Sequence, residues 1–221
     1  MNRIRESPAE MPGSLNSDAF NCYDSGRCLY GTPPFFVFVA KLKVTCLILI
    51  GMMGAGKTTV GRELARRLNL RFADCDHELI ARTGVSVPTI FEIEGEIGFR
   101  RRESRLLAEL LSEQDIVIAT GGGIVLDPDN CALLSERGTV IYLNTPSHVL
   151  WERTRRDRNR PLLQVENPRS RIEELYRQRD PLYRAVADIV VDGERGSCMS
   201  MANRIERALE EHTGRKNTCT P

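Results

Sequence analysis

The sequence predicts an α/β fold in which helices cover both faces of a five-stranded parallel sheet. From residue 44 onward, short apolar runs rich in β-branched residues alternate with longer amphipathic stretches, a pattern typical of buried parallel strands joined by helices. The expected strands are residues 44–50, 70–73, 116–119, 140–143 and 189–191. The chain has 221 residues, enough for one such domain with a substantial core and short for two.

The stretches between these strands have the periodicity of helices, with apolar residues at three- and four-residue spacing. The expected helices are residues 57–68, residues 86–94 capped by Ser86, residues 96–111, one that opens at Thr145 with Pro146 at its first position, and one that carries Met201, Ile205 and Leu209 on its buried side. The segment 155–169 is rich in arginine and poor in apolar anchors, so we expect a mobile lid there.

The two ends of the chain lack this periodicity. We expect one domain at residues 42–212, preceded by a disordered extension at 1–41 and followed by a polar tail at 213–221. A start codon assigned too far upstream would explain the extension equally well. The apolar run 35–40 is soon interrupted by lysines and falls short of the roughly 20 apolar residues that a membrane span needs.

The composition argues against several classes of partner. A formal net charge of +1 is no signature of a nucleic-acid-binding protein, and 41% hydrophobic with 28% charged residues is ordinary for a soluble globular protein. The seven cysteines are odd in number and form no C-x-x-C pair, so we expect reduced thiols in a cytoplasmic protein. We therefore expect neither nucleic acid nor a membrane as a partner.

A phosphate-binding pattern follows the first expected strand. Residues 51–58, GMMGAGKT, match G-x-x-x-x-G-K-[ST] between a strand and a helix. In such a P-loop, backbone N–H groups surround phosphate oxygens, Lys57 reaches the terminal phosphates and the Thr58 hydroxyl ligates Mg²⁺. A Gly-rich turn without a ligand is the alternative. The pattern predicts a P-loop NTPase-type three-layer sandwich that binds ATP and Mg²⁺, with nucleotide contacts from Gly54, Ala55, Gly56, Lys57, Thr58 and Thr59.

Two carboxylates follow the second expected strand. Asp74 and Asp76 lie one residue apart, at the edge where a parallel sheet presents its ligand-facing loops. One can hold Mg²⁺, usually through water, and the other can accept a proton from a substrate hydroxyl. The alternative is a helix N-cap with a solvated acid.

A charged pair lies in the segment 96–111. Arg100 and Glu103 are three residues apart, on adjacent faces of one helix, where the acid can orient the guanidinium. The arginine can belong to a surface ion pair or, in a cleft, can act as a bidentate receptor for a carboxylate. The spacing alone leaves both open.

Three glycines, Gly121, Gly122 and Gly123, follow the third expected strand. One glycine usually supplies the positive φ angle of a tight turn, so three indicate that a ligand approaches bare backbone. A flexible connection is the alternative.

Together, these residues resemble the shikimate kinase family from about residue 44 to about residue 207. The resemblance is carried by the P-loop, DxD at 74–76, Ile90-Phe91, GExxFRxxE at 95–103, GGG at 121–123, RPLL at 160–163 and RxPLY at 179–183. The extension at 1–41 departs from the family, whose chains usually begin close to the first strand. In the lid, Arg155, Arg156 and Arg158 crowd Arg160, and the Pro-Leu-Leu frame assigns the family role to Arg160.

The resemblance implies ATP-dependent phosphorylation of the 3-hydroxyl of shikimate, a step of the chorismate pathway to aromatic amino acids. In the acceptor site, Asp76 would hold the substrate hydroxyls and act as the base. Arg100 and Arg179 would bind the carboxylate. Gly121, Gly122 and Gly123 would belong to the substrate-binding site, with Gly122 in contact with the ring hydroxyls. Phe91 and Phe99 would line the pocket, or else pack in the core.

In the nucleotide site, the resemblance places Lys57 and Arg160 on the transferring phosphoryl group, since arginine and lysine stabilise spreading negative charge. Arg153 would lie against the adenine, and Asp74 would support Mg²⁺ through water. We expect a monomeric, cytoplasmic enzyme whose ligands are shikimate, ATP and Mg²⁺.

Two other functions remain open at this point. One is a kinase of the same architecture with another acceptor, such as gluconate or a nucleoside phosphate; an acceptor without a carboxylate has no use for both Arg100 and Arg179. The other is a ligand-sensing module without turnover, against which the presence of Lys57, Asp76 and Arg160 argues.

Overall fold

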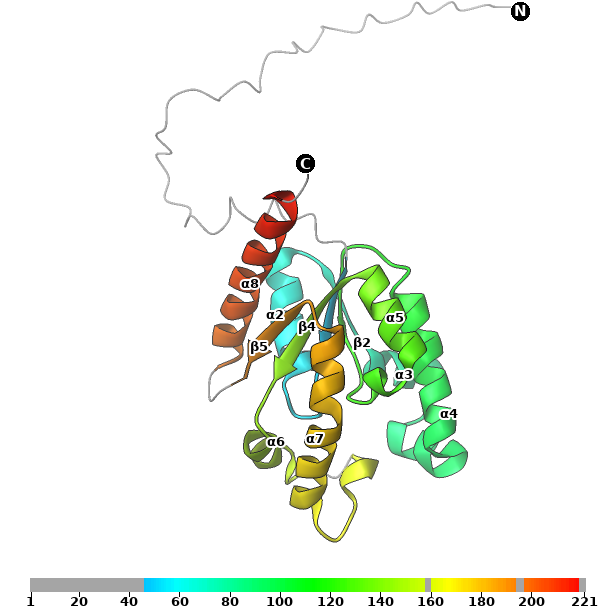
Figure 1. The fold of residues 1–221 in the computed structure, drawn as a ribbon. Coiled ribbons are helices and arrows are strands. Elements are labelled where there is room, and N and C mark those ends of the chain that lie inside the picture. The colour runs from blue at the N-terminus through cyan, green and yellow to red at the C-terminus, as the bar shows by residue number, and fades with distance from the viewer. Residues whose placement is uncertain (1–45, 158–159, 194–196, 219–221) are drawn as a thin grey trace, which may run out of the picture. The chain divides into compact units, whose positions relative to one another are not determined.

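The computed structural model describes residues 46–157, 160–193 and 197–218. Within them, five strands form one parallel sheet in the order β2-β3-β1-β4-β5 (Figure 1). The strands are β1 (Cys46–Ile50), β2 (Arg71–Asp74), β3 (Ile116–Ala119), β4 (Thr139–Asn144) and β5 (Ile189–Asp192). They confirm the predicted fold class. The expected extension at 1–41 and the first two residues of the first expected strand lie outside the described residues.

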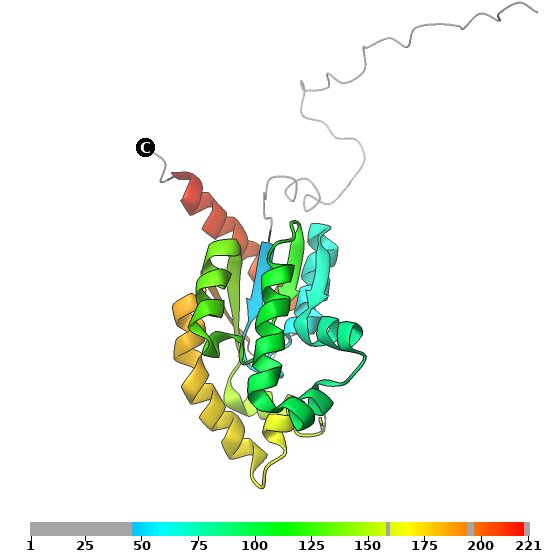
Figure 2. The same ribbon diagram turned by 90° about the vertical axis from the view of Figure 1, so that its right-hand side faces the viewer.

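Helices cover both faces of the sheet, as a three-layer sandwich requires. They are α2 (Lys57–Leu68), α3 (Cys75–Thr83), α4 (Val87–Leu110), α5 (Pro128–Arg137), α6 (Ser147–Thr154), α7 (Pro168–Val186) and α8 (Cys198–Thr218), with the 3₁₀ turns η2 (Ile124–Leu126) and η3 (Pro161–Leu163). Figure 1 and Figure 2 show α2 and α8 on one face and α5 and α7 on the other. None of the described helices is both long enough and apolar enough to span a bilayer.

Two helix predictions are confirmed in detail. The limits of α2 are those of the predicted segment 57–68. The α4 helix begins after Ser86, whose hydroxyl accepts a 3.3 Å hydrogen bond from the N–H of Thr89. Inside α4 the backbone is non-helical at Gly95, with φ 68° and ψ −177°, a conformation that favours glycine. The predicted segments 86–94 and 96–111 are thus two helical pieces joined at Gly95.

Other helix limits differ from the prediction. The predicted start of a helix at Thr145, with Pro146 at its first position, is wrong. Pro146 has φ −56° and ψ 145°, which is outside the helical region, and α6 begins at Ser147. The fixed φ of proline suits a position just before a helix as well as its first turn, so the sequence does not separate the two. At the other end, α8 continues to Thr218, through residues where a polar tail is expected.

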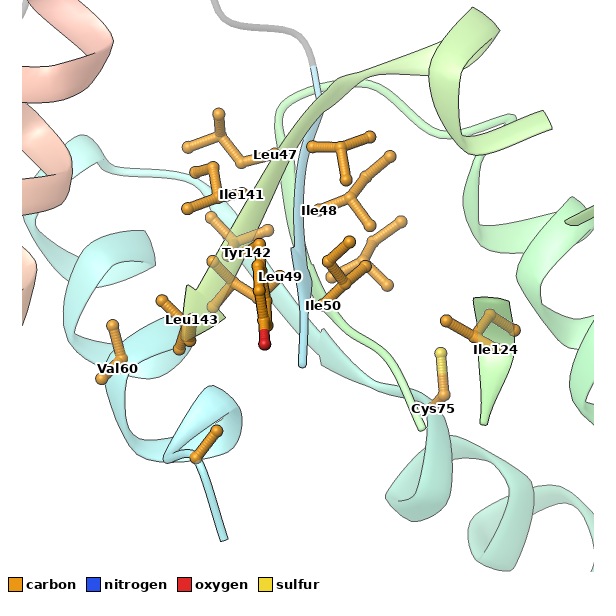
Figure 3. Close-up of a cluster of buried hydrophobic side chains, with 14 of the residues drawn as sticks. Leu47, Ile48, Leu49, Ile50, Val60, Cys75, Ile124, Ile141, Tyr142 and Leu143 are labelled. Atoms are coloured by element: carbon orange, nitrogen blue, oxygen red, sulfur yellow. The ribbon is translucent and has the colours of Figure 1, made fainter. Parts of the chain in front are cut away.

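The core is built around β1. Residues 47–50 are fully buried, because layers on both faces exclude water from a central parallel strand. Figure 3 shows their side chains beside those of Ile141, Tyr142 and Leu143 of β4 and Val60 of α2. Burying one such aliphatic side chain contributes about 1.5–3 kcal/mol, so this cluster holds the central strand rigidly under the loop that follows it.

The loops that carry the sequence motifs meet at one edge of the sheet. Leu49 of β1 pairs with Ala119 of β3, and Ala119 pairs with Asp74 of β2. Because the strands are parallel and in register, the segments that follow them emerge side by side. These segments are the P-loop, the pair Asp74 and Asp76, and the three glycines.

The segment predicted as a lid, 155–169, is described except for residues 158 and 159. It contains η3, whose Leu163 is buried in the core, and α7 begins near its end at Pro168. The segment therefore has an apolar anchor that its composition does not indicate, and its mobility stays a prediction.

Candidate active site

The P-loop wraps round the N-terminus of α2. Gly51, Gly54 and Gly56 have φ angles of 140°, 80° and 100°, which side chains with a Cβ rarely adopt. A Cβ at Gly54 would also lie 2.6 Å from the Thr154 methyl carbon. The loop is held closed by a 3.1 Å hydrogen bond from the Ala55 N–H to the Met52 carbonyl. This backbone leaves the N–H groups at the start of α2 free of intrahelical partners, as an anion site requires.

Lys57 lies inside this loop. Its Nζ donates hydrogen bonds to the carbonyl oxygens of Gly51, at 2.7 Å, and of Met52, at 3.0 Å. Burial lowers the pKa of Lys57 from 10.5 to about 8, with Asp76 opposing that shift and Arg160 adding to it. A cation that is this poorly solvated gains strongly from a phosphate brought beside it.

A cavity of about 410 Å³ adjoins the P-loop. All residues predicted to bind nucleotide line it, namely Gly54, Ala55, Gly56, Lys57, Thr58, Thr59, Arg153 and Arg160. Arg153 Nη1 donates to the carbonyls of Gly54, at 3.2 Å, and Ala55, at 3.3 Å, so its guanidinium is held at the rim of the loop. The cavity has the residues and the location of a nucleotide site.

Asp74 uses its two carboxylate oxygens for different contacts. Its Oδ1 accepts from the N–H groups of Asp76, at 3.0 Å, and His77, at 3.3 Å, and so caps α3. Its Oδ2 accepts a 2.6 Å hydrogen bond from the Thr58 hydroxyl. The two interpretations of Asp74 are therefore compatible, because one oxygen caps α3 while the other lies beside the Thr58 hydroxyl. Together Thr58 and Asp74 present adjacent oxygen atoms, which is the donor chemistry that Mg²⁺ prefers.

A second cavity, of about 450 Å³, adjoins the first. It is lined by the predicted acceptor residues Asp76, Arg100, Gly121, Gly122, Gly123 and Arg179, and by Phe91 and Phe99. The rings of Phe91 and Phe99 pack against each other with centroids 4.6 Å apart, and Phe99 also belongs to the core, so both readings of these residues hold. Met53, Asp76, Gly122 and Arg160 line both cavities.

Asp76 lies at the junction of the two cavities. Its pKa is raised above the ordinary 3.8, first by burial and then by the nearby charge of Asp74, against the opposing effect of Lys57 and Arg160. A carboxylate with a raised pKa is a better proton acceptor than a solvated one.

Arg100 is oriented by two acids. Its Nη1 donates to Glu103 Oε2 at 2.6 Å, and its Nη2 donates to Glu96 Oε1 at 3.1 Å. Glu103 is 2% exposed, so the pair is not the surface ion pair that the spacing left open. Burial raises the pKa of Glu103 even though Arg100 opposes this. The guanidinium is therefore held in the cleft by a desolvated partner.

Arg179 approaches the same cavity from α7 and is 3% exposed. Its Nη1 donates to the Gly122 carbonyl at 2.9 Å. The pKa of Arg179 is lowered, first by burial and further by the like charge of Arg100. In the part of the chain that the structure describes, the buried Nε atoms of Arg100 and Arg179 have no hydrogen-bond partner. Two neighbouring cations that line one cavity favour the binding of an anion there.

Arg160, the residue just before η3, reaches both cavities. Its Nε donates to Asp157 Oδ2 at 2.9 Å, and its side chain is half-buried. From this position the guanidinium lies beside both the P-loop cavity and the second cavity.

The comparisons with known proteins agree with this geometry. The sequence profile described as shikimate kinase matches residues 53–210. The chain is 67% identical to the shikimate kinase of Aromatoleum aromaticum over 173 residues, which are 78% of this chain and 98% of that protein. It is 61% identical to the shikimate kinase of Dechloromonas aromatica over 147 residues, 66% of this chain and 80% of that protein. The chain belongs to the shikimate kinase family.

Solved structures of shikimate kinases have the same fold. The structure of the Acinetobacter baumannii enzyme in complex with shikimate superposes with a TM-score of 0.76 at 46% identity, over 80% of this chain and 98% of that one. The Aquifex aeolicus enzyme superposes with a TM-score of 0.68 at 36% identity, over 76% and 98%. A gluconokinase from Sinorhizobium meliloti, at 14% identity and a TM-score of 0.51 over 80% and 99%, shares the fold alone.

The glycine triplet of this shikimate kinase family member has a structural reason that the sequence does not show. A Cβ on Gly121 would collide with the carboxylate of Glu103, and one on Gly123 would collide with the guanidinium of Arg100. At Gly122 a Cβ would lie 3.3 Å from the Met53 nitrogen in the P-loop. The glycines let the Arg100 and Glu103 side chains and the P-loop approach the backbone closely.

Several lining residues are missed by sequence reasoning. Cys198 and Met201, from the first turn of α8, line the nucleotide cavity, and Val87 and Pro88 of α4 line the second cavity. These are ordinary packing residues in the sequence. Only the folding of α8 against α2 brings the first pair beside the P-loop.

Proposed function

We propose that this chain transfers the γ-phosphoryl group of ATP to the 3-hydroxyl of shikimate, giving shikimate 3-phosphate and ADP for aromatic amino acid biosynthesis. The observation that carries the proposal is the pair of adjoining cavities. The P-loop lines one, Arg100 and Arg179 line the other, and Asp76 and Arg160 line both. Phosphoryl transfer requires this adjacency, because the attacking oxygen and the phosphorus must meet in line. Membership of the shikimate kinase family supports the choice of acceptor.

In this proposal, Arg100 and Arg179 bind the carboxylate of the acceptor. Both side chains line the second cavity. A carboxylate bound by both would relieve the repulsion between the two cations and hold the ring in one orientation. Gly122, on the wall between the cavities, allows the ring to approach the backbone.

Asp76 would accept the proton of the 3-hydroxyl as the oxygen of that hydroxyl bonds to the γ-phosphorus. The bond from the γ-phosphorus to the bridging oxygen breaks at the same time, and ADP leaves. The raised pKa of Asp76 and its place between the cavities support this role.

Lys57 and Arg160 would neutralise the charge that spreads over the transferring phosphoryl oxygens. Thr58 and Asp74 would hold Mg²⁺, Asp74 through water, because their oxygen atoms lie 2.6 Å apart beside the nucleotide cavity. The bound ion supplies charge neutralisation on the phosphates. Arg153, held at the rim of the P-loop, would stack on the adenine.

We further propose that the enzyme acts as a monomer in the cytoplasm. Residues of this one chain line both cavities. The cysteines, odd in number and without a C-x-x-C pair, support a reducing compartment.

The test is a coupled ADP-release assay with Mg-ATP that compares shikimate, quinate, gluconate and AMP at equal concentrations. We expect turnover with shikimate far above that with the other three. Turnover with gluconate or AMP alone would keep the phosphoryl-transfer chemistry and refute the acceptor. Absence of turnover with all four would refute the kinase and leave a sensing module.

A further inference from the structure

Tyr183 of α7 is a buried residue that contacts the glycine wall of the second cavity, residues 121–123, although it does not itself line that cavity. Its hydroxyl donates a 2.5 Å hydrogen bond to the carbonyl oxygen of Gly122, and Arg179 Nη1 donates to the same oxygen at 2.9 Å. Tyr183 is fully buried. Burial raises the pKa of its hydroxyl, so the group remains a protonated donor in the pH range where an enzyme works.

The ring of Tyr183 is held on its other side by Tyr142 of β4. The two rings stack with centroids 4.9 Å apart and an interplanar angle of 27°. The Tyr142 hydroxyl donates in a different direction, to Asp180 Oδ1 at 2.8 Å, and Tyr142 lines neither cavity. The stack therefore fixes the position of the Tyr183 hydroxyl. Of the two tyrosine hydroxyls, the one of Tyr183 bonds to the glycine wall.

The hydrogen bonds to the Gly122 carbonyl orient the whole peptide group between Gly122 and Gly123. The C=O of Gly122 and the N–H of Gly123 belong to one planar trans peptide and point in opposite directions. Binding the carbonyl to α7 therefore sets the plane of a glycine segment that has little intrinsic stiffness. The same bond orients Arg179, because Arg179 and Tyr183 share the carbonyl as acceptor.

We propose that Tyr183 is a positioning residue for the acceptor: its hydroxyl holds the Gly122 carbonyl, and through it the glycine wall and Arg179, in the arrangement that binds shikimate. The inference rests on the proposed function. The Tyr183 hydroxyl also lies 3.8 Å from the sulfur of Met52 in the P-loop, but a thioether is a weak acceptor and the short bond is the one to the Gly122 carbonyl. Loss of the hydroxyl should therefore affect the acceptor site more than the nucleotide site.

The test compares Tyr183→Phe with the matched control Tyr142→Phe in the full chain. Each variant keeps the stacked rings and removes one buried hydroxyl. For Tyr183→Phe we expect the KM for shikimate to rise about threefold to tenfold, the size of effect that loss of one hydrogen bond produces, with a smaller change in the KM for ATP. For Tyr142→Phe we expect both KM values to stay at wild-type levels. The melting temperature of each variant is measured beside the kinetics.

The possible outcomes distinguish a failure of the Tyr183 proposal from a failure of the proposed kinase function. Wild-type enzyme that fails to phosphorylate shikimate would overturn the proposed function and the inference with it. Wild-type turnover combined with an unchanged shikimate KM in Tyr183→Phe would overturn the inference alone. Equal rises in shikimate KM in both variants would mean that the stack is merely structural, which also overturns it. If Tyr183→Phe is poorly folded, the dissociation constant of shikimate is measured in the Tyr183→Phe protein recovered at low temperature, where a wild-type value is again the contradicting result.

Discussion

Thr58 and Asp74 are joined by a 2.6 Å hydrogen bond that links the first turn of α2 to the end of β2. The bond connects two segments 16 residues apart in sequence, and each contributes an oxygen atom beside the nucleotide cavity. The other carboxylate oxygen of Asp74 caps α3, the helix that carries Asp76. One side chain thus couples the expected metal position to the placement of the expected base.

Asp74→Asn separates these two tasks. Asparagine caps a helix about as well as aspartate, so we expect little change in stability. The lost charge should raise the Mg²⁺ concentration needed for half-maximal activity, which a Mg²⁺ titration at fixed ATP measures. The matched control is Asp127→Asn at the N-cap of α5, which should leave the titration unchanged. An unaltered Mg²⁺ requirement in Asp74→Asn would contradict the metal role.

Asp76→Asn removes the proposed proton acceptor while keeping its size. We expect kcat to fall roughly 10²- to 10⁴-fold, the usual contribution of a general base, with the melting temperature nearly unchanged. Steady-state kinetics with shikimate measure it. Glu78→Gln on the same helix, where Glu78 forms an exposed ion pair with Arg71, is the control and should retain wild-type kcat. Intact turnover in Asp76→Asn would refute the role.

Arg100→Ala should raise the KM for shikimate about 10- to 100-fold and change the KM for ATP little, because charge-assisted hydrogen bonds to a carboxylate are lost. It should also lower the melting temperature, since Glu103 is left buried without its partner. The control is Arg102→Ala in the same helix, where Arg102 pairs with Glu94 at the exposed surface. Equal KM values for shikimate in the two variants would argue against a carboxylate receptor at Arg100.

The pH profile should report Lys57 and Asp76 on opposite limbs. The pKa of Lys57 is lowered to about 8, so in the free enzyme its positive charge is lost as pH rises through 8, and kcat/KM for ATP should fall there. The pKa of Asp76 is raised above 3.8, so kcat/KM for shikimate should fall on the acid side at a pH above that value. Rates from about pH 5 to about pH 10 measure both limbs. An alkaline limb that persists unshifted in Lys57→Arg, which stays charged, would contradict the assignment.

The free energy of unfolding should also depend on pH through Lys57. Because the folded pKa lies below the unfolded value of 10.5, the unfolded chain binds more protons between about pH 8 and 10.5. The contribution of Lys57 to the free energy of unfolding should therefore increase as pH rises through that window. Denaturant unfolding of wild type and Lys57→Met across the window measures the difference, and equal pH slopes in the two proteins would contradict it.

The nucleotide half of the site is largely readable from the sequence. The P-loop is a contiguous pattern whose backbone conformation depends on local glycines, and its flanking strand and helix have strong periodicity, so residues 51–68 appear in the structure as predicted. The same holds for the strands, because helices on both faces require continuous apolar runs. The sequence also predicts the interruption at Gly95, between the helical segments 86–94 and 96–111, and the backbone of α4 is non-helical there, with a positive φ angle.

The acceptor half depends on contacts between distant segments. The spacing of Arg100 and Glu103 allows a surface pair or a receptor, and the burial of Glu103 against Gly121 excludes the surface pair. The link from Tyr183 to Gly122 spans 61 residues and leaves no local pattern. The sequence by itself thus determines the α/β fold, the P-loop and the class of chemistry, since these follow from local conformation and periodicity. The tertiary structure alone decides that the charged groups of Glu103 and Arg179 are desolvated and that the Tyr183 hydroxyl bonds to the Gly122 carbonyl. Burial and hydrogen-bond direction exist only once the helices pack.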